Sequence, residues 1–156
     1  MINIDFVGRW PEQDRFEEYT HNVLNHFFKY RLKRNVDINL KMINNLKVLG
    51  WSDGDRNEVN IELCRKDSNS DKIPVTELAK TLAHELVHAK QFLRGEINGK
   101  NDYYTRGKSK HINYSKTSYR EQPWEHEAFM MEDFLHKLYW ESNRYIKLTQ
   151  KIFQYA

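Results

Sequence analysis

The residues with the clearest capacity for chemistry form the pentapeptide His84-Glu85-Leu86-Val87-His88. Two histidines four positions apart lie on one face of an α-helix, so both imidazoles can reach one metal ion. Zinc favours imidazole ligands, and tetrahedral geometry accepts two donors from one helix. Glu85 stands about 100° further around the helix, where it can reach water beside the ion without binding the ion. The pentapeptide predicts a Zn²⁺ site with Glu85 as general base.

A catalytic zinc site needs a third protein ligand and leaves a fourth position to water. The metzincin arrangement is absent, because Gln91 and Arg94 stand where that pattern has Gly and His. The best source of the third ligand is the segment 123–128, Pro-Trp-Glu-His-Glu-Ala, at the start of a predicted helix. The candidates are Glu125, Glu127 and His126, with His111 of the preceding loop as a further rival.

The Glu-x-x-Ala of Glu125 to Ala128 resembles the third-ligand motif of the ImmA/IrrE peptidases and the membrane prenyl-protein endopeptidases. In those families the liganding Glu stands three residues before an Ala, so the resemblance selects Glu125 over Glu127. Only one of the two can serve, because residues two apart point about 200° apart on a helix. Those families have a polar residue where this chain has Phe129, which leaves Glu127 or Asp133 to support a ligand histidine.

The order of predicted elements also resembles that of minimal zincins with a glutamate third ligand (gluzincins), of SprT-like proteins, and of short phage-encoded metallopeptidase-like proteins. SprT-like proteins use a third histidine, so the match to them is incomplete. The resemblance implies a zinc metalloendopeptidase that acts on a protein or peptide substrate. A phage-encoded chain of this kind would lie in the host cytoplasm.

In this reading, Glu85 takes a proton from water and later passes it to the leaving amine. The first choice for the donor to the oxyanion is Tyr119, six residues before Glu125. The tyrosines could equally serve packing or loop solubility. The predicted strand from Val59 to Leu63 would pair with an extended peptide by strand addition. Reserve oxyanion donors are Tyr104, His111 and Tyr114.

Hydrophobic periodicity predicts the elements that must position these residues. Apolar residues at three- and four-residue steps predict three helices, over 11–34, over 76–95 and from 123 onward. Alternation predicts three strands, over 36–42, 47–51 and 59–63, with a hairpin turn at 52–55. The expected fold is α+β, a single minimal zincin-like domain over 1–156. Its parts are an N-terminal helix, a three-stranded mainly antiparallel sheet, the active-site helix, a long loop and the C-terminal ligand helix.

Composition narrows the class of protein. Charged residues make up 30% of the chain, and no run approaches the roughly 18 apolar residues of a membrane span, so we expect no membrane partner. The start of the chain at Met1 lacks the features of a secretory signal. The lone Cys64 suits a reducing compartment and excludes zinc sites built from several cysteines. These features favour a cytoplasmic protein.

Two other functions stay open. The loop over 100–120 carries six basic residues against the single acid Asp102, which is typical of a solvated loop but would also suit contact with nucleic acid. A nucleic-acid-associated module is therefore one alternative. The other is a zinc-binding protein with a structural or regulatory role and no catalysis. The basic residues are Lys100, Arg106, Lys108, Lys110, Lys116 and Arg120.

Overall fold

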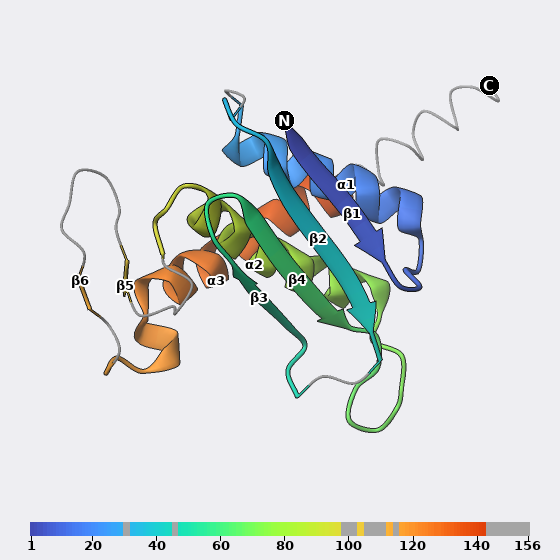
Figure 1. Ribbon diagram of the computed structural model, residues 1–156. Coiled ribbons are helices and arrows are strands. Elements are labelled where there is room, and N and C mark those ends of the chain that lie inside the picture. Colours follow the sequence, from blue (N-terminus) through green and yellow to red (C-terminus); the bar gives the residue numbers. More distant parts are fainter. Residues whose placement is uncertain (30–31, 45–46, 98–102, 105–111, 114–115, 143–156) are drawn as a thin grey trace.

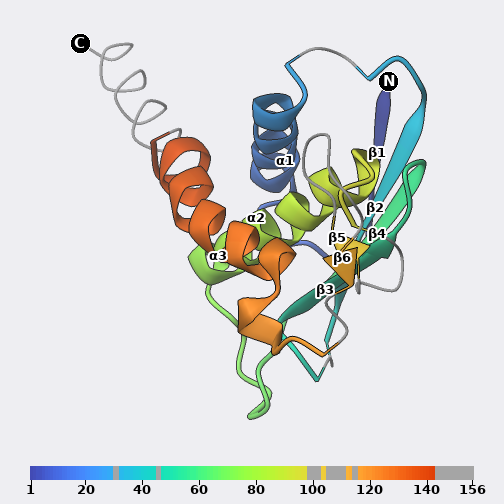
Figure 2. The same ribbon diagram turned by 90° about the vertical axis from the view of Figure 1, so that its left-hand side faces the viewer.

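The computed structural model describes residues 1–29, 32–44, 47–97, 103–104, 112–113 and 116–142. The fold is α+β, as expected from the sequence, with a four-stranded sheet and helices on one of its faces (Figures 1 and 2). In chain order the elements are β1 (Ile2–Val7), α1 (Gln13–Phe27), β2 (Val36–Ile43), β3 (Gly50–Gly54), β4 (Glu58–Cys64), α2 (Val75–Leu93), β5 (Tyr103–Tyr104), β6 (Ile112–Asn113), the 3₁₀ turn η1 (Tyr119–Glu121), α3 (Pro123–Leu135) and the π-helical turn η2 (His136–Glu141).

The main sheet is mixed, and the expectation of three mainly antiparallel strands was wrong. Its order is β1-β2-β4-β3, with β1–β2 and β2–β4 parallel and only β3–β4 antiparallel. The strand β1 was missing from the expectation. The strands β1 and β2 can run parallel because α1 lies between them in the chain. This helix returns the chain to the end of the sheet at which β1 began. The β3–β4 hairpin was expected, although its turn follows Gly54.

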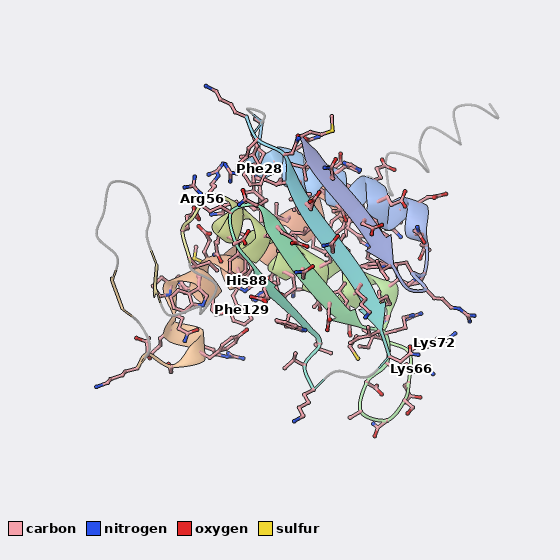
Figure 3. All side chains as sticks on the ribbon, in the orientation of Figure 1. Phe28, Arg56, Lys66, Lys72, His88 and Phe129 are labelled. Carbon is pink, nitrogen blue, oxygen red and sulfur yellow. The ribbon has the colours of Figure 1, made fainter. Side chains whose placement is uncertain are left out.

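One face of the sheet forms the core. Alternate residues of β2 and β4 point inward, and no solvent reaches Ile38, Leu40, Val59 or Ile61. The same core contains residues of α1 and α2. The opposite face carries polar side chains, and Figure 3 shows it without a covering helix among the described elements. The sheet is thus a one-sided platform for the helices.

Helix α2 is the most enclosed helix, because it packs on the sheet and also contacts α1 and α3 (Figure 2). It ends at Leu93, two residues before the expected stop at Gly95, whose φ of 68° is left-handed. The N–H of Gly95 bonds the carbonyl of Phe92, and the N–H of Glu96 bonds that of Gln91. This pair of bonds is a Schellman motif, which glycine permits because it has no Cβ.

The other two helices differ from expectation at their ends. Helix α1 stops at Phe27 and not near Arg34, because the chain must turn back to enter β2 at Val36. Helix α3 begins at Pro123 as expected and continues into η2, where Trp140 packs against the ring of Phe16. Any continuation of this predicted helix beyond residue 142 lies outside the described residues. No described helix is both long enough and apolar enough to cross a bilayer.

Candidate metal centre

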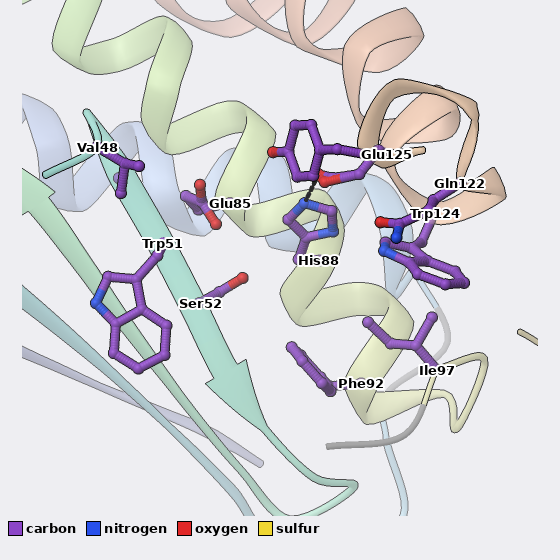
Figure 4. Close-up of a pocket in the computed structure, with 12 residues that line it drawn as sticks. Val48, Trp51, Ser52, Glu85, His88, Phe92, Ile97, Gln122, Trp124 and Glu125 are labelled. Carbon is purple, nitrogen blue, oxygen red and sulfur yellow. Dashed lines mark hydrogen bonds and ion pairs between the residues drawn. The ribbon is translucent and has the colours of Figure 1, made fainter. Parts of the chain in front are cut away.

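Three buried side chains converge where α2 meets α3. His84 Nε2 and His88 Nε2 lie 3.2 Å apart. The Oε1 atom of Glu125 lies 3.1 Å from the first of these nitrogens and 2.6 Å from the second. Figure 4 shows the contact between His88 and Glu125 as a dashed line. The structure therefore brings together the two histidines of the pentapeptide and Glu125, the glutamate that the resemblance selected.

Each ligand reaches this point for a local reason. His84 and His88 are one helical turn apart on the buried length of α2. Glu125 stands in the first turn of α3, which Pro123 begins with its ring at the first helical position. All three residues are at most 7% exposed. The packing of α3 on α2 thus supplies the third ligand across the helix pair.

The second ring nitrogen of each histidine is held by a hydrogen bond. His84 Nδ1 lies 3.0 Å from Glu132 Oε2, and His88 Nδ1 lies 2.7 Å from Gln91 Oε1. The amide of Gln91 is itself oriented, because its Nε2 donates to the Trp124 carbonyl at 2.9 Å and to Glu127 at 3.0 Å. Its oxygen must therefore face His88.

These bonds determine which atoms face the centre. Because Glu132 and Gln91 offer acceptors, both Nδ1 atoms act as donors, and each neutral ring keeps its lone pair on Nε2. Two lone pairs and a carboxylate oxygen then point at one another. Such a group of acceptors is stable only with positive charge between its members, supplied by protons or by a metal ion. The donor set therefore fits a metal ion.

The pKa values follow from the same arrangement. Burial alone would lower the pKa of His84, but hydrogen bonds with Glu125 and Glu132 outweigh it and raise the pKa to about 9. Burial would likewise raise the pKa of Glu125, but its bonds with the two histidines hold it at about 2. For His88, burial is again outweighed by the bond with Glu125, so its pKa is raised. The carboxylates around the two histidines thus stabilise positive charge at the ring nitrogens.

Glu85 lies beside the three ligands without joining them. It is 5% exposed and lines the same cleft as His88 and Glu125. Its carboxylate hydrogen-bonds the Ser52 side chain of β3, and burial raises its pKa. This is the placement expected for a group beside a metal ion. Its role as general base stays a prediction.

Tyr119 also lines the cleft, from the turn η1 before α3. Its hydroxyl hydrogen-bonds Glu125, and burial together with that carboxylate raises its pKa. The residue as a whole is 60% exposed. Its role as oxyanion donor stays a prediction. The reserve donors His111 and Tyr114, and the side chain of Tyr104, lie outside what the structure describes.

The support of the histidines differs from expectation. Asp133 pairs with Lys80 at 2.7 Å on the surface, and Glu127 accepts a hydrogen bond from Gln91, the residue that bonds His88. Phe129 makes an aromatic contact with His84, and the centroids of the two rings are 4.7 Å apart. Glu132 and Gln91 were missed, although helical spacing points to both. Glu132 is seven residues after Glu125, and Gln91 three after His88.

The rival ligands lie elsewhere. His126 is exposed. Glu127 accepts a bond of 2.6 Å from the buried Lys90, whose ammonium also contacts Glu96 at 2.7 Å. Neither belongs to the metal-ligand group of the described residues, which consists of His84, His88 and Glu125. The choice between neighbouring candidates is thus made by which side of α3 faces α2.

A cleft of about 440 Å³ opens beside the ligands, between β3, α2 and the start of α3 (Figure 4). Gly50 lines it where β3 approaches α2, and a Cβ there would come within 2.9 Å of the Thr81 side chain. The expectation that residues 59–63 border the cleft with a free edge was wrong. That strand, β4, is paired on both sides, whereas β3 is the edge strand of the main sheet.

The site is thus a buried His-His-Glu group that can hold a metal ion, with a cleft beside it. Comparisons with protein-family models, with curated proteins and with solved structures found no match. The functional interpretation therefore depends on the geometry and chemistry of the site. The basic residues of the loop over 100–120, apart from Lys116 and Arg120, lie outside the described residues.

Proposed function

We propose that the chain is a zinc-dependent metallopeptidase that hydrolyses peptide bonds of a protein or peptide substrate. One observation carries the proposal. Three inward-facing acceptors, two imidazoles and one carboxylate, converge beside a second buried carboxylate, that of Glu85, which lines the adjoining cleft. A structural metal site needs no such additional carboxylate, whereas hydrolysis needs a base next to the ion.

The donor set supports zinc as the metal. Two imidazoles and one carboxylate are the protein ligands of several catalytic zinc sites, which keep a fourth position open. Tetrahedral zinc with ligand distances of about 2.0–2.1 Å places its ligands about 3.3 Å apart. The separations of 3.2 and 3.1 Å fit this value, and the 2.6 Å contact between His88 and Glu125 needs a small outward movement of the carboxylate. Bound zinc supplies Lewis acidity, which lowers the pKa of water to about 7 and polarises a carbonyl.

The side chains of this protein would perform the proton transfers. Glu85 accepts a proton from the attacking water and donates it to the leaving amine. Ser52 orients the Glu85 carboxylate through their hydrogen bond. The raised pKa of Glu85 makes it a stronger base toward the attacking water. Burial of this carboxylate in the cleft thus favours the first proton transfer.

Tyr119 would donate a hydrogen bond to the oxyanion of the tetrahedral intermediate. Its hydroxyl is bonded to Glu125 in the structure, so this role requires it to turn toward the substrate. Its exposure of 60% leaves it room to turn.

An extended peptide would bind along β3. This strand has one edge unpaired among the described elements, and Trp51 and Ser52 of the same strand line the cleft. Main-chain hydrogen bonds to a strand edge align a peptide without demanding a particular sequence. The scissile bond would then lie across Glu85 and the two ligand histidines.

The test is an unbiased peptide-cleavage screen combined with metal analysis of the purified protein. We expect one zinc per chain and cleavage, with Glu85→Gln keeping the zinc but losing about 100- to 10,000-fold in rate. The control is Glu77→Gln, an exposed glutamate on the same helix, which should leave activity unchanged. Glu125→Ala should remove the metal.

Full activity of Glu85→Gln on a peptide that the protein cleaves would refute the general-base role. Stoichiometric zinc with no cleavage of any peptide in the screen would favour a non-catalytic metal protein. Binding of DNA or RNA that weakens steeply with salt would favour the nucleic-acid alternative.

A further inference from the structure

The cleft has two chemically different ends. Glu85, His88 and Glu125 form the end at the metal ligands, whereas Phe92, Ile97 and Trp124 form the other. In Figure 4 the rings of Phe92 and Trp124 and the side chain of Ile97 gather on one side of His88, away from Glu85. These three residues are between 1% and 6% exposed, so their side chains form a closely packed apolar wall.

Ile97 is held in this wall by the end of α2. The left-handed turn at Gly95 reverses the chain, and the buried Lys90 then binds Glu96 at 2.7 Å. These two constraints fix the residues on either side of the turn, so Ile97 follows in a set position. The wall is therefore part of the folded framework of α2.

Trp124 is held from the α3 side. It directly precedes the ligand Glu125, and its carbonyl accepts the bond from Gln91. The apolar wall and the metal ligands are thus neighbours on both α2 and α3. A substrate side chain bound against the wall would lie next to the peptide bond that Glu85 and the metal ligands act on.

The residues that line the cleft disfavour a charged substrate side chain at the apolar end. No lysine or arginine occurs among the described residues that line the cleft, so an acidic side chain would find no cation among them and would share the cleft with two carboxylates. A basic side chain would have to lose its water against Phe92 and Ile97. A neutral apolar side chain would replace water at the wall without either penalty.

We propose that this apolar end is a specificity pocket that takes a large apolar or aromatic side chain adjacent to the scissile peptide bond. The inference rests on the proposed peptidase function and adds the class of substrate. Burying a leucine or phenylalanine side chain against such a wall gives about a 10- to 100-fold preference over an alanine or a charged residue at that position.

The first measurement is binding and does not depend on turnover. Zinc-loaded Glu85→Gln protein is titrated calorimetrically with synthetic peptides that differ at one position, carrying Leu, Phe, Ala, Asp or Lys. The peptides with Leu and Phe should bind at least about 10-fold more tightly than those with Asp and Lys. Equal affinities across the set would overturn the inference. The wild-type protein is then scored for cleavage of the same peptides.

The second measurement changes the wall. Ile97→Arg introduces a cation into the apolar end, so it should reduce cleavage of the Leu peptide about 10-fold or more and improve that of the Asp peptide. Ile97→Ala, which burial tolerates more readily, should shift the preference from Leu toward Phe. The matched control is Leu49→Arg, the same change at an exposed residue that does not line the cleft.

The outcomes separate the inference from the function. Cleavage without a preference for apolar residues, or an unchanged preference in both Ile97 variants, would overturn the pocket and leave the peptidase standing. Selective binding of the Leu and Phe peptides without cleavage by the wild type would support the pocket and refute the peptidase. Thermal melting and zinc content of each variant confirm that it is folded.

Discussion

At the scale of single residues, the two ligand histidines have unlike supports. A carboxylate, Glu132, accepts from His84, and a neutral amide, Gln91, accepts from His88. A carboxylate makes the ring it holds a stronger donor to a metal, because it stabilises positive charge on that ring. The amide fixes orientation without adding charge. His84 should therefore be the more basic ligand of the pair.

The role of Glu132 can be tested by a graded series. Glu132→Ala removes the acceptor and should weaken zinc binding about 10- to 100-fold, whereas Glu132→Gln keeps an acceptor oxygen and should weaken it less. Competition with a zinc-binding dye measures both affinities. Asp133→Ala is the control, because that neighbouring carboxylate pairs with Lys80 on the surface. Wild-type affinity in Glu132→Ala would show that the bond to His84 has no effect on the metal.

At the scale of elements, the end of α2 organises much of the cleft. The Schellman turn at Gly95 places Glu96 against Lys90 and Ile97 in the cleft wall. Lys90 also binds Glu127 of α3, so the same lysine connects the end of α2 to the ligand helix. A buried lysine is tolerated here because two carboxylates surround its ammonium.

Substitution of Gly95 measures what this turn contributes. The residue has a φ of 68°, and a side chain there costs about 1 kcal/mol of folding free energy. Gly95→Ala should therefore lower the free energy of unfolding by about that amount in urea, and Gly95→Asn by less, since asparagine tolerates the left-handed region better. Equal stability of the alanine variant and the wild type would mean that the helix end can rearrange.

At the scale of the whole molecule, the ligand group joins the two helices that enclose the cleft. α2 is fixed by the sheet, while α3 lies over α2 on the side away from the sheet (Figure 2). A metal ion bound by His84, His88 and Glu125 would therefore link α3 to the rest of the fold. Metal binding and stability should be coupled.

Removal of metal tests this coupling. An ion present at about 100 times its dissociation constant adds about 2.7 kcal/mol to the folded state, which corresponds to roughly 5–10 °C in Tm for a chain of this size. A chelator should lower the Tm of the wild type by about that much, and added zinc should restore it. The melting of Glu125→Ala should not respond to chelator. An unchanged Tm of the chelated wild type would indicate that no metal links the helices.

Local patterns of the sequence determined several features of this protein. The four-residue spacing of His84 and His88 placed both on one helical face, Gly95 ended that helix, and Pro123 began the next. Alternation located β2 and β4, together with the residues that they bury. These features could be predicted because capping and hydrophobic periodicity act over a few neighbouring residues.

Only the tertiary structure determined which side chains face one another and which strands pair. It placed Glu125, and not Glu127 or His126, next to the two histidines. It placed Glu132 and Gln91 within hydrogen-bond distance of the Nδ1 atoms of these histidines. It also made β3 the edge strand of the main sheet. It also paired β1 with β2 in parallel. Strand partners and helix rotations are set by how all the apolar surfaces of the chain are buried together. A pattern within one segment carries no information about that arrangement.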